Sequence, residues 1–172
     1  MTAIAAVLIA MGIVSVFAAW LLSRTTGVRS DVTVIASDAG YLPPETLKDP
    51  KLRIRGRPDY LVRDRSTGAI YPIEVKPTRD AAELYESDAL QLGAYMLLTE
   101  TRYGVEFAGY GVVRYRSAEF RVPLTAELRR RCAAAAVAIR AARRAAAIHR
   151  SHEVRAKCWA CGVRSVCDES LA

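Results

Sequence analysis

The stretch GRPDYLVRDRSTGAIYPIEVKP, residues 56–77, carries two apolar segments on either side of a turn. RIRGRPDYLVRD (53–64) alternates enough between apolar and polar residues to predict a strand, and RSTG (65–68) is typical of a turn. AIYPIEVKP (69–77) is β-branched and largely apolar, which predicts a second and central strand. The simplest pairing of the two strands is a hairpin.

A helix and two further strands follow this hairpin. Apolar residues recur through 88–103 and Gly104 comes next as a C-cap, which predicts a largely buried helix. VEFAGYGVVRY (105–115) and AEFRVPLT (118–125) predict two more strands, and Thr125 caps a long Ala-rich helix. The order of strand, strand, helix, strand, strand, helix predicts a mixed α/β domain with a small sheet.

The beginning of the chain has a different composition. Residues 1–23 contain no charged side chain, and 3–22 are long and apolar enough to predict a transmembrane helix. The alternative is a cleaved signal peptide, but no basic residue precedes the apolar run. Arg24 and Arg29 follow it, so the positive-inside rule predicts a single-pass anchor with the remaining domain in the cytoplasm.

Four segments are therefore expected: a transmembrane anchor at 1–23, a linker and irregular lead-in at 24–50, the core with its long C-terminal helix at 51–157, and a Cys-containing tail at 158–172. The chain is 52% hydrophobic, which excludes long disorder, and four Cys in 172 residues are too few for a disulfide-rich scaffold. The net charge of +7 favours an anionic partner such as nucleic acid or a lipid surface.

Three chemically reactive residues lie in the predicted hairpin: Asp59, Glu74 and Lys76. Glu74 and Lys76 are two positions apart on a strand, so their side chains point to the same face. Asp59 is within cross-strand reach of them. Converging carboxylates repel each other unless a hard cation such as Mg²⁺ binds, and such a site can assist phosphodiester hydrolysis. The simpler alternative is a surface Glu–Lys pair, which contributes little.

Three motifs follow one another along the chain: GRPDYLV (56–62), IEVK (73–76) and QLGAY (91–95). In this order they resemble the PD-(D/E)-x-K nuclease superfamily. Within it they look like the RecB-like exonucleases, which include CRISPR-associated proteins of the Cas-four type. The resemblance implies a restriction-endonuclease-like fold, that is, an α/β mixed sheet flanked by helices.

The resemblance also implies the roles of individual residues. Asp59 and Glu74, with a backbone carbonyl near Val75, would hold Mg²⁺ or Mn²⁺, and Lys76 would be the catalytic lysine. The matching activity is a metal-dependent deoxyribonuclease acting on DNA, an exonuclease rather than an endonuclease. Whether it serves CRISPR adaptation, DNA repair or a mobile element stays open.

Gln91 and Tyr95 complete the predicted catalytic set. They are four residues apart, so they share one helix face, and they would orient DNA or the lysine. Related nucleases often carry a further metal ligand before the first motif. Asp38 and Glu45 are the two candidates here, and both are also ordinary turn residues.

The tail CWACGVRSVC holds Cys158, Cys161 and Cys167, a spacing found in zinc and iron–sulfur sites. It resembles the C-terminal part of the iron–sulfur clasp of the same nucleases, which implies a [4Fe–4S] cluster. The upstream cysteine that usually supplies the fourth ligand is missing, and Cys132 is expected to be a small buried residue. A zinc site and the loss of the cluster are the alternatives.

Residues 129–157 carry nine Arg or Lys against one acid, Glu153. Backbone phosphate contact is the functional interpretation, and attraction to an anionic membrane surface or a merely solvated helix face are the alternatives. Two other hypotheses for the whole chain remain. One is a catalytically inactive nuclease fold that binds DNA or a partner at the membrane, and the other is an exported protein with two disulfides.

Overall fold

The computed structural model describes residues 11–12, 14–15, 31–38 and 45–172. These fall into two compact units, one up to Ala134 and one from Ala135 to Ala172. The predicted anchor lies outside the described residues except for positions 11, 12, 14 and 15, which are helical. Among the residues described, no helix has the length and apolar character needed to cross a bilayer.

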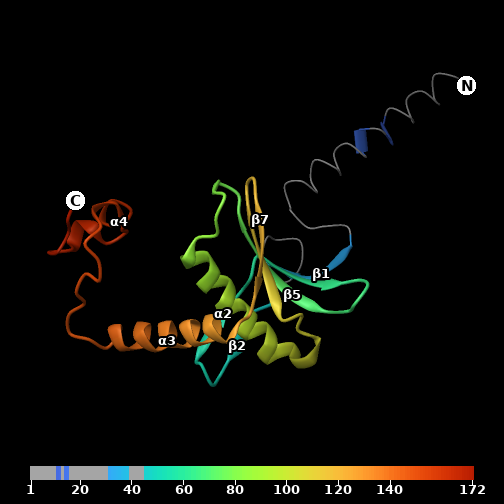
Figure 1. Cartoon of the computed structure of the whole chain (residues 1–172), viewed down its shortest axis with the longest axis horizontal. Coiled ribbons are helices and arrows are strands. Elements are labelled where there is room, and N and C mark those ends of the chain that lie inside the picture. Colours follow the sequence, from blue (N-terminus) through green and yellow to red (C-terminus); the bar gives the residue numbers. More distant parts are fainter. Residues whose placement is uncertain (1–10, 13, 16–30, 39–44) are drawn as a thin grey trace, which may run out of the picture. The chain divides into compact units, whose positions relative to one another are not determined.

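A five-stranded sheet forms the centre of the first unit (Figure 1), in the order β1-β4-β5-β6-β7. All neighbours are antiparallel except β5 and β6, which are parallel because α2 connects them. The strands are β1 (Val32–Ser37), β4 (Tyr60–Asp64), β5 (Ile70–Lys76), β6 (Tyr110–Tyr115) and β7 (Glu119–Pro123). The sheet is mixed and β5 is its central strand, as predicted.

The predicted pairing of two strands around the turn at 65–68 is confirmed, but the first of these strands is shorter than predicted. β4 and β5 pair with Tyr60 opposite Ile73, and residues 65–68 form the turn. A single strand over 53–64 is wrong, because the segment is divided at Arg57 and Pro58. Proline has no N–H to donate to a sheet and restricts the residue before it. The residues before the break form β3 (Ile54–Gly56), which pairs with β2 (Leu47–Asp49) in a separate two-stranded sheet.

The segment expected to be a linker and irregular lead-in, residues 24–50, contains β1 and β2 in its described part. β1 reads VTVIAS, which is β-branched, and its Val32 and Ala36 are buried against the sheet. The Gly and Pro residues around it point to turns locally. The edge strand forms because β4, more than twenty residues later, offers it a partner.

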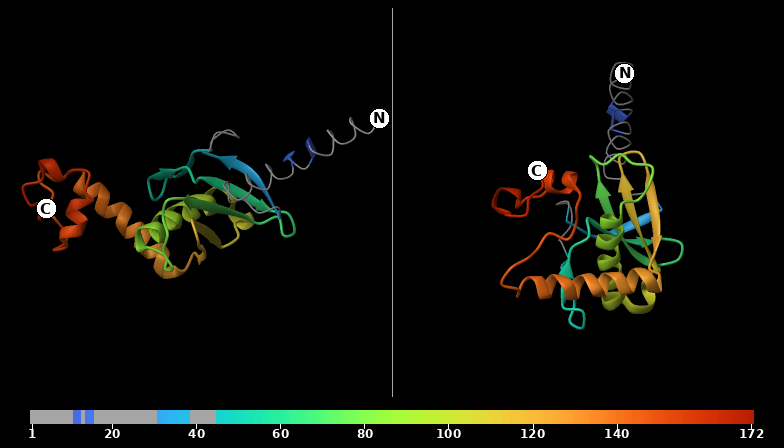
Figure 2. Two further views of the ribbon diagram at one scale, coloured as in Figure 1. Left: turned by 90° about the horizontal axis from the view of Figure 1, so that it is seen from above. Right: turned by 60° about the vertical axis from the view of Figure 1, so that its left-hand side comes forward.

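α2 (Glu86–Tyr103) packs against β5 and β6 and also contacts β2 and β3 (Figures 1 and 2). It ends at Gly104, whose φ of 55° is unfavourable for other residues, as the sequence predicted. Leu92 and Met96 are fully buried and pack with Val113 in the main core cluster.

α3 (Ala126–Ala142) begins in the first unit and ends in the second. Thr125 directly precedes α3, and its hydroxyl accepts a hydrogen bond from the Leu128 N–H at 3.1 Å. Cys132 is buried and its sulfur would lie 2.6 Å from a Cβ at Gly93, so glycine lets α2 and α3 approach closely. Cys132 is therefore a core residue, as predicted. The second unit also contains α4 (Arg155–Trp159) and the short helical turn η2 (Arg164–Val166).

Candidate active site

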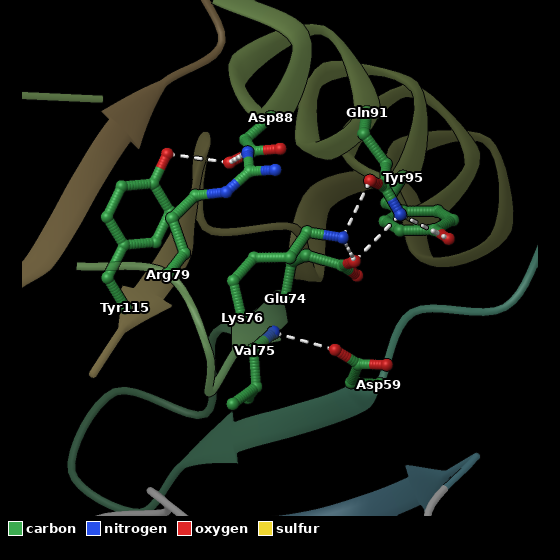
Figure 3. Close-up of polar contacts among 9 residues, drawn as sticks. All are labelled: Asp59, Glu74, Val75, Lys76, Arg79, Asp88, Gln91, Tyr95 and Tyr115. Carbon is green, nitrogen blue, oxygen red and sulfur yellow. Dashed lines mark hydrogen bonds and ion pairs between the residues drawn. The ribbon is translucent and has the colours of Figure 1, made fainter. Parts of the chain in front are cut away.

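The β4–β5 register decides where the two candidate carboxylates meet. Asp59 directly precedes β4, and because Tyr60 is opposite Ile73, Asp59 comes next to Glu74 and Val75. Its Oδ2 accepts a hydrogen bond from the Val75 backbone N–H at 2.6 Å (Figure 3). This bond fixes the Asp59 side chain against the central strand.

Glu74 lies in the middle of the site and is only 3% exposed. Its Oε1 accepts hydrogen bonds from the Lys76 ammonium at 2.6 Å and from the Gln91 amide at 2.7 Å (Figure 3). Its Oε2 is buried and has no hydrogen-bond partner among the described residues. A buried carboxylate oxygen left without a donor is unfavourable, so this oxygen is available to a group other than the described residues.

Two residues of α2 complete the polar cluster. The Lys76 ammonium also donates to Gln91 Oε1 at 3.0 Å, and the Gln91 amide lies 3.2 Å from the Tyr95 hydroxyl. Tyr95 in turn packs on Gly56, where a Cβ would be 2.7 Å from the ring. The chain from Glu74 through Gln91 to Tyr95 therefore depends on a glycine at the end of β3.

Burial dominates the electrostatics of the cluster. It raises the pKa of Glu74, and the nearby charge of Asp59 raises it further, against the hydrogen bond from Lys76. Burial also raises the pKa of Tyr95. The site thus disfavours additional negative charge. A bound cation would reverse this preference, because its positive charge stabilises nearby carboxylates.

The donor set fits a hard divalent cation. Asp59 and Glu74 contribute carboxylate oxygens from adjacent strands, and one of these oxygens is buried and unpartnered. Within the described residues, no group of three or more His, Cys, Asp or Glu side chains lies close enough together to hold a metal. The remaining ligands would be backbone carbonyl or water, and Mg²⁺ usually keeps several waters.

A second polar network adjoins the first, and the sequence analysis missed it. Asp88 is 4% exposed, and its Oδ2 accepts hydrogen bonds from the Tyr115 hydroxyl at 2.6 Å and from the Arg79 guanidinium. Arg79 also lies over the Tyr85 ring, 4.8 Å from its centroid. Asp88 is three residues before Gln91, so it shares the helix face of Gln91 and Tyr95 (Figure 3). The three-residue spacing of Asp88 and Gln91 was the feature of the sequence that could have revealed this network.

The two candidates for a further metal ligand have other partners. Asp38 lies 3.8 Å from the Arg57 guanidinium, although its backbone N–H donates to the Asp59 carbonyl. Glu45 accepts hydrogen bonds from Arg102 at 3.0 Å and from the Tyr103 hydroxyl at 2.7 Å. Neither carboxylate joins Asp59 and Glu74 in a group that could hold a metal.

The three cysteines of the tail lie in the second unit. Cys158 and Cys161 are brought near each other by a turn in which the Cys161 N–H donates to the Cys158 carbonyl at 3.1 Å. Cys158 is buried, Cys161 is exposed and Cys167 is half-buried, and all are free thiols. In the described part of the chain these cysteines are not part of a group of three or more potential metal ligands.

The basic stretch 129–157 is less unbalanced in the fold than in the sequence. Arg129 pairs with Glu100 at 2.6 Å, Arg130 pairs with Glu127 and Arg131 pairs with Glu86. Acids outside the stretch thus neutralise its first three arginines.

Comparisons with known proteins place this site in a family. A search of curated proteins found no match. A solved structure described as "Crystal structure of SSO0001" is similar with 20% identity and a TM-score of 0.48, over 95% of this chain and 71% of the other. The family model of the PD-(D/E)XK nuclease superfamily matches residues 7–168, nearly the whole chain. Because this match spans most of its length, the chain belongs to the PD-(D/E)XK nuclease superfamily.

Proposed function

We propose that this protein is a metal-dependent deoxyribonuclease of the RecB-like type. The observation that carries the proposal is the buried Glu74, which is held on one oxygen by Lys76 and Gln91 and left open on the other. A structural ion pair with Lys76 accounts for the bonding of Oε1 but gives Oε2 no partner among the described residues. The second oxygen faces a site that suits a cation.

Asp59 and Glu74, with a backbone carbonyl at Val75, would hold Mg²⁺ or Mn²⁺. The bound cation would supply charge stabilisation at the phosphoryl oxygen. Lys76 is restrained by Glu74 and Gln91, and its ammonium can orient a water or offset charge that develops on the phosphate. Gln91 and Tyr95 hold Lys76 and Glu74 in place.

The first experiment measures cleavage of end-labelled single-stranded DNA in Mn²⁺ by the full chain. We expect Lys76→Ala and Glu74→Gln to lower the rate by about 100-fold or more. Lys157→Ala and Glu106→Gln are matched controls outside the cluster and leave the rate unchanged. If the unaltered chain cuts no better than Lys76→Ala, the proposal of an enzyme fails. Retained DNA binding without cleavage then favours the inactive binding module.

The finer features each have a separate test. Exonuclease action predicts that a circular single-stranded substrate resists cleavage. A membrane anchor at 1–23, supported by its apolar length, predicts that the protein sediments with membranes and needs detergent for release. The iron–sulfur prediction rests on cysteine spacing, and iron and zinc contents after anaerobic purification test it. A colourless sample free of zinc removes both metal assignments.

A further inference from the structure

The two-stranded sheet β2–β3 carries an unusual concentration of positive charge. Residues 48–57 hold five basic side chains, at positions 48, 51, 53, 55 and 57. The one acid, Asp49, is buried and engaged: its Oδ1 accepts hydrogen bonds from two backbone N–H groups and its Oδ2 accepts one from Thr101 at 3.0 Å. We call the segment Leu47–Arg57 the basic hairpin.

The two faces of the basic hairpin have different chemistry. Leu47 is 1% exposed and faces α2, as does Gly56, which contacts Tyr95. Lys48 and Arg55 are exposed on the other face and lie directly opposite each other in the register. Like charges in directly opposed positions destabilise a sheet. Neither side chain has an ion-pair partner in the described part of the chain, so nothing there compensates the repulsion.

The exposed face of the basic hairpin is hollowed. An open pocket of about 500 Å³ is lined by Thr46, Lys48, Arg55, Gly56 and Arg57. The Thr46 hydroxyl accepts a hydrogen bond from Arg57 Nε at 2.7 Å, which orients the guanidinium. Arg57 also lies 3.8 Å from the Asp38 carboxylate, in an exposed ion pair. Three cations around one open pocket, with a hydroxyl beside them, provide donors of the kind that bind phosphate oxygens.

The pocket adjoins the candidate active site. Arg57 is two residues before Asp59, so their Cα atoms lie within about 7 Å of each other. Gly56 belongs to the pocket on one side and contacts Tyr95 on the other. The pocket is therefore close to Asp59 and Tyr95, two residues of the candidate site.

We propose that the basic hairpin binds the backbone phosphates of the DNA strand that flank the cleaved bond, through Lys48, Arg55 and Arg57. The proposal rests on the proposed function for the identity of the strand. It places phosphate binding in the hairpin and not in the arginines at 129–131, which pair with Glu100, Glu127 and Glu86.

The test measures the affinity of the full chain for a fluorescent single-stranded oligonucleotide in EDTA, where cleavage does not occur. We expect Lys48→Ala/Arg55→Ala to weaken binding by about tenfold, and to reduce the slope of log affinity against log salt by about 1.4, or about 0.7 for each phosphate contact. Arg130→Ala/Arg131→Ala removes the same charge from paired residues and changes binding little. If both double variants weaken binding equally, the proposal is wrong.

A second variant separates binding from folding. Lys48→Glu creates a cross-strand pair with Arg55, so we expect the melting temperature to rise or stay unchanged while DNA affinity falls. A variant that keeps DNA affinity overturns the proposal. So does a Lys48→Ala/Arg55→Ala protein that loses binding to anionic lipid vesicles but not to DNA.

Cleavage in Mn²⁺ separates this proposal from the proposed function. With an active nuclease, Lys48→Ala/Arg55→Ala raises KM and leaves kcat unchanged, because neither residue touches the reacting atoms. A fall in kcat at constant KM contradicts the assignment. If no chain cleaves DNA, the proposed function fails, and the binding experiment in EDTA still decides the role of the basic hairpin.

Discussion

Glu74 is a carboxylate on the central strand of a sheet, where apolar residues normally lie. Its neighbours Ile73 and Tyr71 are buried as packing residues, whereas Glu74 is buried with one oxygen unpartnered. An incompletely paired buried charge destabilises a fold. A bound cation would account for its presence there better than packing does.

Asp88 stabilises the start of α2 through buried hydrogen bonds to Arg79 and Tyr115. We expect Asp88→Asn to lower the free energy of unfolding by about 2 kcal/mol, because it removes a charge-assisted bond and leaves Arg79 without its carboxylate. Asp80→Asn is the matched control, since Asp80 pairs with Arg116 on the surface, where an ion pair contributes little to stability. Urea unfolding measures both, and equal losses would contradict this account.

Gly56 positions Tyr95. We expect Gly56→Ala to displace the Tyr95 ring, because the new Cβ would lie 2.7 Å from it, and to lower stability by about 1–3 kcal/mol. The proposed cleavage rate should fall by about 10- to 100-fold, since Tyr95 and Gln91 hold Lys76 and Glu74 in place. Gly162→Ala has open space around its Cβ and should change neither quantity. Unfolding curves and kcat measure the two effects.

At the level of elements, the site forms where β5 lies between β4 and β6. Asp59, just before β4, accepts a hydrogen bond from the Val75 N–H of β5. Because β5 and β6 are parallel, the helix α2 that connects them packs across the sheet. The site therefore depends on the β4–β5 register. A shift by one residue would turn Glu74 to the opposite face.

The β4–β5 turn carries its own pH dependence. The Ser66 hydroxyl and the backbone N–H groups of Thr67 and Ser66 hydrogen-bond Asp64 and lower its pKa to about 2. The lowered pKa means that the stabilisation is full above the ordinary pKa of the carboxyl and is lost as the pH falls towards about 2. We expect the urea midpoint of wild type to exceed that of Asp64→Asn at pH 6, and the difference to narrow between pH 4 and about 2. A constant difference would contradict the assignment.

At the scale of the whole molecule, the candidate site and most of the cysteines lie in different units. The first unit carries the candidate site and the basic hairpin, and the second carries three of the four cysteines. All four cysteines are free thiols in the structure, one in the first unit and three in the second.

Thiol reactivity tests this description. We expect four reactive thiols in denaturant. In the native protein, Cys161 should react first because it is exposed, and Cys132 last because burial both shields it and raises its pKa. Ellman's reagent measures the rates, and Cys161→Ser should remove the fastest phase. Fewer than four thiols in denaturant would support the exported, disulfide-bonded alternative.

The sequence by itself determined the local parts of this protein. The turn at 65–68, strand β5 and the end of α2 at Gly104 are encoded within a few residues, and the sequence predicted all three. The spacing of Glu74 and Lys76 placed both on one strand face, and Gln91 and Tyr95 are one helical turn apart. These relations need only the periods of strand and helix.

Only the tertiary structure decided which distant segments meet. β1 gained its partner from β4, and β3 separated from β4 at Pro58 to pair with β2. Asp88 found Arg79 and Tyr115, and the first arginines of α3 found acids on other elements. Such contacts depend on long-range packing, and the periodicity of a strand or helix gives no information about it.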